Sequence, residues 1–504
     1  MDSSTNRKIG IVLSYAYTIA SICVQLIYVP LLLGGIGQDE YGLYQLVGSF
    51  ASWVMSMNGI LSAAVVRYYC KYKAENNVEK MNSTLALSRW IYLVLSVVAI
   101  GVMAIFAVVF PFIYKDTFTP AQIHECSLML IVLGFNIATT MSNTVDLAAI
   151  TANERFIFLK GIQLSVTFLE PLMVLLMLET FPNALMVTCV VFSMNLLSSV
   201  CRTIFSRKVL KIKIKYQFFD RGLFKSLVAF SGVVLLVTCA DQIFWKTDQL
   251  IIGYYYGPSE VAIYAIGAQV YSAYMMLGLA ISSVFMPRIS ELYGKPDGLK
   301  EVNSLFIQVG RLSLYVLLGV LCGFFIFGRD FVSLWAGGEY IEAWYIAVII
   351  MVPFTIDLVQ NLGLTILQVT NNYLFRGVMY FALALVNIVL TIVLLNRIGI
   401  VGAAISTALA MFVGNGVIMN LYYFKKIKLD IPAFWGSLAK EAIPLILLTA
   451  VVYFIWNGIN HDVANWGTLI AGIGVYCILY LIVVRIFSMN DYEKHLLNNV
   501  LKRN

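Results

Sequence analysis

Three charged residues interrupt an apolar stretch of this sequence that runs from about residue 226 to 253. Asp241, Lys246 and Asp248 share one side of a helix that turns about 100° per residue. The same side carries Trp245, Gln242 and Gln249. An ion pair between Lys246 and a carboxylate would partly offset the burial of both. We favour a functional alternative, in which Lys246 meets a substrate phosphate as a point charge and an aspartate binds a cation or a proton.

The next apolar stretch, from about 262 to 286, adds two tyrosines to one helix face, Tyr271 and Tyr274. Aromatic faces that also carry hydroxyl groups suit sugar rings, and both residues lie too deep in the stretch to be interfacial anchors. We therefore predict that both tyrosines line a substrate cavity.

Polar side chains also recur at helical spacing in other apolar stretches, where they should face a cavity or another helix. The predicted cavity residues in this group are Gln25 in the first stretch, Asn143 and Asp146 in the fourth, and Asp357 and Asn361 in the tenth. Hydrogen bonds between packed helices would account for some of them. The second stretch carries a similar stripe of Gln45, Ser49, Ser52 and Ser56. Because such stripes occur on at least four stretches, we favour a shared hydrated cavity.

Motifs for catalysis and cofactor binding are missing from the sequence. It contains no G-x-x-x-x-G-K-[S/T], G-x-S-x-G or H-E-x-x-H motif. The eight cysteines form no C-x-x-C pair, and the three histidines are scattered in or near expected loops. We therefore expect no enzyme activity, no metal site and no cofactor, apart from coupling to Na⁺ or H⁺.

The elements that must hold these residues are membrane-spanning helices. Only 12% of the 504 residues are charged and 60% are apolar, whereas a globular domain has about 25% charged residues. A span needs about 20 mostly apolar residues. Fourteen stretches qualify, at about 9–33, 42–66, 87–112, 121–148, 157–179, 182–205, 226–253, 262–286, 305–328, 340–368, 373–395, 398–424, 438–457 and 464–487. The sequence predicts an all-α integral membrane protein without a soluble domain.

Positive charge predicts the orientation of these spans. Nearly all of the 34 lysines and arginines fall in alternate gaps, together with the two termini. Because cytoplasmic loops carry the excess of basic residues, both termini are predicted to be cytoplasmic. The net charge of +7 is then a consequence of topology and indicates no nucleic-acid partner.

An internal repeat relates the two halves of the chain at an offset of about 220 positions. The segment 37–44 reads GQDEYGLY, and the segment 257–264 reads GPSEVAIY. Duplicated halves are common in transporters, where they pack around a central site. We therefore expect two six-helix lobes around a central cavity, followed by two additional C-terminal helices.

The repeated motif, the segment 402–408 (GAAISTA) and the fourteen spans together resemble the multidrug/oligosaccharidyl-lipid/polysaccharide exporter superfamily, specifically its polysaccharide-biosynthesis, Wzx-like flippase branch. The resemblance implies alternating access and outward transport of an undecaprenyl-diphosphate-linked oligosaccharide across a bacterial inner membrane. Expected partners are this substrate, membrane lipids and polysaccharide polymerase or assembly proteins. The expected parts are residues 1–206 as the N-lobe, 207–225 as a basic linker, 226–424 as the C-lobe and 425–504 as the last two helices and tail.

The sequence departs in two ways from related branches of the superfamily, and these departures limit which functional residues the resemblance can assign. The first stretch has no aspartate, unlike the proton-coupled drug exporters that the chain resembles, which disfavours the alternative of a cation-coupled small-molecule or drug antiporter. Asn387 and Thr391 resemble half of the sodium site of the lipid II flippase branch, so Asp248 with these two residues is the expected ion-coupling site.

Overall fold

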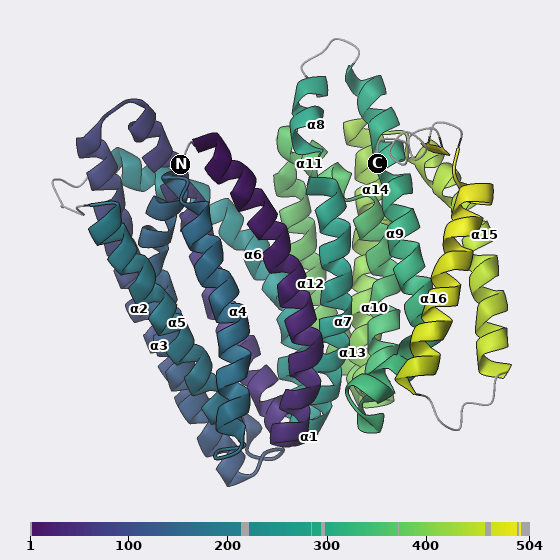
Figure 1. Ribbon diagram of the computed structural model, residues 1–504, viewed down its shortest axis with the longest axis horizontal. Helices are drawn as coiled ribbons and strands as arrows, with labels where there is room; N and C mark the ends of the chain where they lie inside the picture. The colour runs from purple at the N-terminus through teal and green to yellow at the C-terminus, as the bar shows by residue number, and fades with distance from the viewer. Residues whose placement is uncertain are drawn as a thin grey trace. The chain divides into compact units, whose positions relative to one another are not determined.

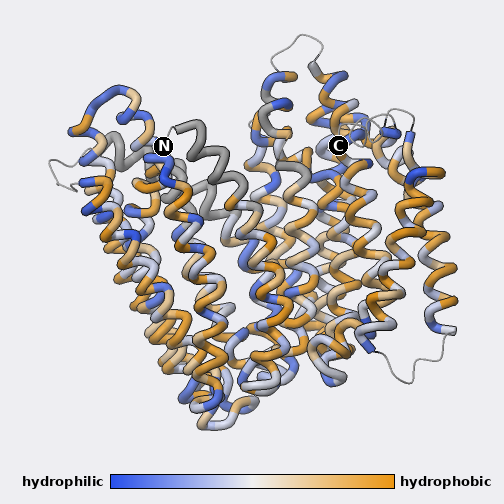
Figure 2. The backbone as a smooth tube through the Cα atoms, in the orientation of Figure 1, coloured by the Kyte–Doolittle hydropathy of each residue, from blue (hydrophilic) through white to orange (hydrophobic). Residues whose placement is uncertain are grey.

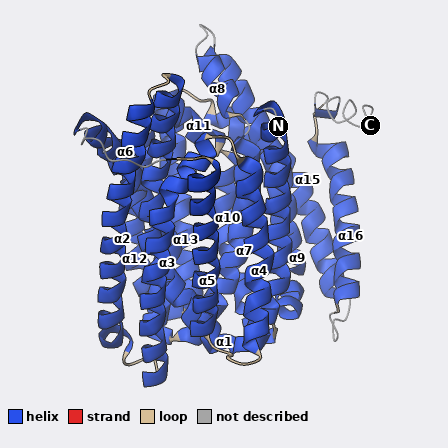
Figure 3. Ribbon diagram, turned by 60° about the vertical axis from the view of Figure 1, so that its left-hand side comes forward, coloured by secondary structure: helices blue, strands red, loops and turns tan. Residues whose placement is uncertain are grey.

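The computed structural model describes residues 3–212, 221–283, 285–293, 298–370, 372–458, 465–490 and 493–494. These residues are helical apart from short connections, as Figure 3 shows. The α-helices are α1 (Ser3–Ala74), α2 (Val78–Tyr114), α3 (Pro120–Ala152), α4 (Phe156–Leu178), α5 (Ala184–Ile204), α6 (Arg221–Tyr256), α7 (Pro258–Ser283), α8 (Met286–Tyr293), α9 (Gly298–Trp335), α10 (Glu342–Val359), α11 (Leu362–Val369), α12 (Tyr373–Ile398), α13 (Ile400–Met411), α14 (Met419–Tyr422), α15 (Ile431–Gly458) and α16 (Trp466–Val483). Short π-helical turns follow α5, α13, α14 and α16.

The protein is a multi-pass membrane protein. Within the described residues, twelve helical segments are long and apolar enough to cross a bilayer. One of them, Ala16–Ser56, contains Gly37, whose φ of 82° and ψ of 172° break α1 between the first two predicted spans. α6 is not among the twelve. The count of fourteen and the cytoplasmic termini stay predictions, which cysteine labelling from either side of the membrane would test.

Large apolar side chains cover the outer faces of the helices. Val97 is 70% exposed, Phe112 74% and Phe454 73%. Figure 2 shows hydrophobic residues along the middle of the helices and hydrophilic ones toward many of their ends. A surface of this kind is stable only against lipid, because a soluble protein rarely exposes large apolar patches.

The chain divides into two compact units, residues 1–262 and 263–504. In the first unit α3 packs against α1, α2 and α5, and α1 packs against α4 and α6 (Figure 1). In the second unit α9 packs against α10, α15 and α16, while α13 packs against α10 and α12. The sequence expectation assigned residues 226–253 to the C-lobe, whereas this division groups α6 with α1. The predicted lobe boundaries stay predictions.

The internal repeat is visible in the backbone of the first unit. Gly37 and Gly257 adopt nearly the same left-handed φ, 82° and 84°, which glycine reaches without strain. The repeat-related residues Asp39 and Ser259 are hydrogen bonded through their side chains. Gln38 Nε2 donates to the backbone oxygen of Ser259 at 3.1 Å. The two copies of the motif therefore pack directly on each other.

Gly42 provides a test of this packing, because a Cβ at that position would overlap the carbonyl oxygen of Pro258. We expect Gly42→Ala to lower the free energy of unfolding by about 1–3 kcal/mol, the usual cost of overpacking. Gly48→Ala on the same helix is the matched control, since no atom lies within 4 Å of its Cβ position. Thermal unfolding in detergent measures both variants, and equal midpoints would contradict the close contact.

One arginine joins three segments of the second unit. Arg311 of α9 pairs with Glu441 of α15 and donates from Nε and Nη2 to Glu493, at 2.6 and 2.7 Å. The Tyr315 hydroxyl donates to the backbone oxygen of Ser488 at 2.9 Å. Partial burial raises the pKa of Glu493, but the hydrogen bonds from Arg311 outweigh it, so this pKa lies below its usual value. The cluster ties the segment after α16 to α9 and α15.

Candidate functional site

A cavity of about 450 Å³ lies within the first unit, among α1, α3, α5 and α6. Its lining residues are Ala51, Ser52, Met55 and Ser56 of α1, Leu133, Asn136, Ile137 and Thr140 of α3, Asn195 of α5, and Gln242 and Lys246 of α6. Seven of these eleven side chains are polar or charged. Polar residues inside a bilayer mark functional sites by default, so this cavity is the leading candidate.

Amide and hydroxyl groups shape one side of the cavity. Asn195 Nδ2 donates to Thr140 Oγ1 at 2.6 Å and also to Asn136 Oδ1, which joins α5 to α3. On α1, Ser52 and Ser56 donate to backbone oxygens of their own helix. The hydroxyl oxygens retain acceptor capacity toward the cavity. The set resembles the groups that bind sugar hydroxyls.

Among the described residues, Lys246 is the one charged residue that lines the cavity. Across the described part of the chain, the structure records no hydrogen bond or ion pair for its ammonium group. The nearby Gln242 Oε1 is buried and has no hydrogen-bond partner among the described residues. An ammonium group among neutral amides and hydroxyls can attract an anion. The substrate-binding role of Lys246 and the alternative of a structural ion pair both stay predictions.

The other predicted residues of α6 lie beside the cavity rather than in its lining. Gln249 is buried and accepts a hydrogen bond from Ser49 Oγ, which joins α6 to α1. Asp248 is also buried, whereas Asp241 and Trp245 are partly exposed. Gln25 on α1 is exposed and does not line this cavity.

Asn143 and Asp146 line a different cavity of about 500 Å³, between α2, α3 and α5. Asn143 Nδ2 donates to the Ser199 backbone oxygen at 2.9 Å. Asp146 accepts a hydrogen bond from Thr203 at 3.2 Å, and its Oδ2 lies 3.9 Å from Arg89 Nη1. The polar stripe on α3 therefore serves two separate cavities.

The predicted residues at the α10 break belong to the second unit. α10 ends at Val359 and α11 begins at Leu362, so the helix is interrupted beside Asn361. Asp357 Oδ2 lies 4.0 Å from Arg376 Nη2, and the Arg376 guanidinium lies over the Tyr380 ring. The negative charge of Asp357 is therefore paired with the positive charge of Arg376 in the same unit.

Tyr274, Asn387 and Thr391 are buried in helix packing of the second unit. The Tyr274 hydroxyl shares a hydrogen bond with Thr355 on α10 at 2.6 Å. Asn387 Nδ2 donates to Thr407 at 3.1 Å, and its Oδ1 accepts from Ser406 at 2.6 Å, which joins α12 to α13. Tyr271 is buried as well.

Sequence reasoning missed Thr140 and Asn195, the cavity residues that are bonded to each other. Asn195 is the one amide side chain of α5, which is a usable signal because such groups are costly against lipid. Arg89 and Arg376 were interpreted only as topology signals, although each pairs with a predicted site residue.

Comparisons with known proteins agree with this picture. The family model described as polysaccharide biosynthesis protein matches residues 36–345. A curated relative, the probable low-salt glycan biosynthesis flippase Agl15 of Haloferax volcanii, is 22% identical over 199 residues. The alignment covers 40% of this chain and 42% of that protein, so it spans less than half of either.

Solved structures share the fold. The lipid II flippase MurJ, in an inward closed conformation, superimposes with a TM-score of 0.73 at 16% identity, covering 95% of this chain and 98% of MurJ. An inward-facing multidrug resistance MATE family transporter of the MOP superfamily gives 0.63 at 12% identity, with 86% and 99% covered. These likenesses show that the fold is MurJ-like and MATE-like. Because the family match covers more than half of the residues, the chain belongs to the polysaccharide biosynthesis protein family.

Proposed function

We propose that this protein is an alternating-access flippase that moves a lipid-linked oligosaccharide across the membrane for surface polysaccharide synthesis. The observation that carries the proposal is the Lys246 cavity, in which one ammonium group faces neutral amides and hydroxyls. Family membership and the flippase name of a relative support the same function.

The chemistry of the lining matches the two parts of such a substrate. A diphosphate offers charged oxygen acceptors, and Lys246 supplies a charged donor that can form short, strong hydrogen bonds with them. Sugar hydroxyls both donate and accept, as do the amides of Asn136, Asn195 and Gln242. The carrier we propose is undecaprenyl diphosphate, the membrane is the bacterial inner membrane, and polysaccharide polymerase or assembly proteins are the proposed protein partners.

The competing function is cation-coupled export of small molecules or drugs, which the MATE-like fold also accommodates. A cationic drug binds favourably to a carboxylate or to the face of an aromatic ring. The eleven described residues that line the Lys246 cavity include no carboxylate. The cavity therefore favours the anionic, sugar-bearing substrate.

Proteoliposomes test the choice between the two functions. Purified protein should move a fluorescent undecaprenyl-diphosphate oligosaccharide between leaflets well above the rate in protein-free vesicles, and should leave the distribution of a cationic dye unchanged. Dye transport without lipid movement would overturn the proposal in favour of the antiporter.

We further propose that transport is coupled to Na⁺ or H⁺ at Asp248, with Asp241 acting on substrate binding. A coupling ion must bind the two access states with different affinity, since only differential binding shifts an equilibrium. Asn387 and Thr391 are weaker coupling candidates because Asn387 already bridges α12 and α13. Asp248→Asn should remove the dependence of lipid movement on a sodium or pH gradient, whereas Asp241→Asn should mainly raise the substrate concentration required. Gradient dependence that survives in Asp248→Asn would rule out this residue.

A further inference from the structure

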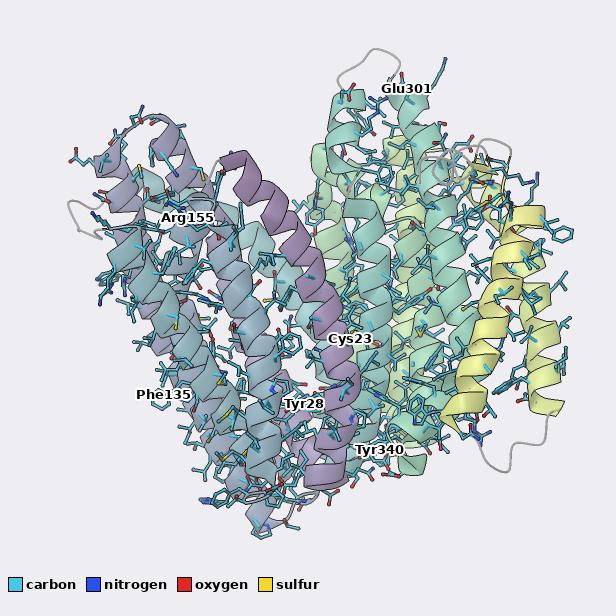
Figure 4. The ribbon with its side chains drawn as sticks, viewed as in Figure 1. Cys23, Tyr28, Phe135, Arg155, Glu301 and Tyr340 are labelled. Carbon is cyan, nitrogen blue, oxygen red and sulfur yellow. The ribbon has the colours of Figure 1, made fainter. Side chains whose placement is uncertain are left out.

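The cavity between α2, α3 and α5 opens toward lipid. Its lining includes apolar side chains that are largely exposed, among them Val97 (70%), Phe135 (49%) and Val200 (45%). Figure 4 shows Phe135 at the outer edge of the α2, α3 and α5 group. In a bilayer such an exposed apolar face contacts acyl chains. We call this cavity the lateral groove.

Polar residues gather at one end of the lateral groove. Arg89 lies near the beginning of α2, Asp146 near the end of α3 and Thr203 near the end of α5. Arg89 and Ile100, which both line the groove, are eleven residues apart on α2, or ~16 Å along a helix. That length is about half the thickness of a bilayer core. The charged groups thus lie at one end of the groove, and the rest of its length, which is lined by apolar side chains together with Ser96, Thr139 and Ser142, suits one leaflet.

Two polar atoms in this groove have unmet hydrogen-bonding capacity. Asp146 Oδ1 and Ser199 Oγ are buried and have no hydrogen-bond partner among the described residues, although both residues line the groove. The structure records only the 3.9 Å approach to Asp146 for the charged end of Arg89 within the described chain. Buried polar groups without a partner are unfavourable, so a ligand that forms hydrogen bonds with them would bind favourably.

We propose that the lateral groove binds phosphatidylethanolamine from the surrounding bilayer. Its phosphate would accept hydrogen bonds from Arg89, and its primary ammonium would donate to Asp146 Oδ1 and Ser199 Oγ. The lining carries one positive and one negative charge, which matches a zwitterionic headgroup. Choline has no N–H to donate, and a glycerol headgroup offers no positive charge to the carboxylate.

Native mass spectrometry of the purified protein tests this proposal, with dioleoyl phosphatidylethanolamine, phosphatidylglycerol and phosphatidylcholine added at equal concentration. Wild type should retain the ethanolamine lipid about tenfold more strongly than either of the others. Arg89→Gln should lose about tenfold of this retention, as expected when one charge-assisted hydrogen bond is removed.

Two further variants keep the test independent of folding effects. Thr139→Phe adds bulk to the groove lining without changing charge, and should also reduce retention of the ethanolamine lipid. Arg155→Gln is the matched control, because Arg155 is exposed and lies outside the lining. Equal retention of the three lipids, preference for phosphatidylglycerol, or wild-type retention in both groove variants would each overturn the proposal.

Discussion

Lys246→Met should lose most lipid-linked oligosaccharide transport while the protein keeps or gains thermal stability. Methionine preserves the linear shape of the side chain but removes the charge that would hold the diphosphate. A hydrogen bond to a charged group contributes about 1.5–3 kcal/mol, which corresponds to roughly 10- to 150-fold in substrate affinity. Because the ammonium is partly buried without a recorded partner in the described structure, its removal also relieves a desolvation cost.

A loss of transport without a loss of thermal stability would distinguish a functional role of Lys246 from a structural one. Lys115→Met is the matched control, since Lys115 is exposed at the end of α2 and lies outside the cavity. Flipping assays in proteoliposomes and melting curves in detergent measure the two quantities on the same preparations. A fall in stability with transport preserved per folded molecule would identify Lys246 as a structural residue.

Arg311→Met should destabilise the protein by about 3–5 kcal/mol, because it leaves two carboxylates beside the first half of α9 without their cation. The side chains of Glu441 and Glu493 are only 3% and 16% exposed. Arg288→Met is the control: that arginine also pairs with two glutamates, Glu291 and Glu301, but all three are about half exposed. An exposed pair contributes only about 0–1 kcal/mol.

The destabilisation caused by Arg311→Met should depend on pH, because one of the two carboxylates is Glu493. The pKa of Glu493 in the folded protein lies below its usual value. Its contribution to the free energy of unfolding is therefore fully present above the pKa of the unfolded chain, about 4.3, and is lost as the pH falls through the pKa in the folded protein. The stability gap between wild type and Arg311→Met should therefore narrow below about pH 4. A gap of constant size down to pH 3 would exclude Glu493 as a paired carboxylate.

The sequence predicted the helical membrane fold because length and hydropathy determine it. Most apolar stretches that were expected to span the membrane coincide with one helix, whereas the stretch 340–368 is divided between α10 and α11. Gly37 and Gly257, which the repeat offset relates, share a left-handed φ. The contact between Gly42 and Pro258 could not be predicted from the sequence. A repeat predicts that its copies have equivalent conformations, but it does not indicate whether the copies touch each other.

The site was only partly predictable for a similar reason. A charge in the middle of an apolar stretch identified Lys246. On α3, however, Asn136 and Asn143 occupy the same helical stripe, and the structure places them in separate cavities. Periodicity gives the face of a helix, whereas the neighbouring helices change along its length. The partner of Asp357 is likewise Arg376 on another helix, which no local pattern indicates.

The most direct test of the account is whether Lys246 binds the diphosphate. Affinities should be measured by native mass spectrometry for wild type and Lys246→Met, with an undecaprenyl-diphosphate oligosaccharide and with the same oligosaccharide linked to undecaprenol without phosphate. The account predicts that wild type binds the diphosphate form about tenfold or more tightly, and that Lys246→Met binds both forms equally. An unchanged preference for the diphosphate form in Lys246→Met would contradict it.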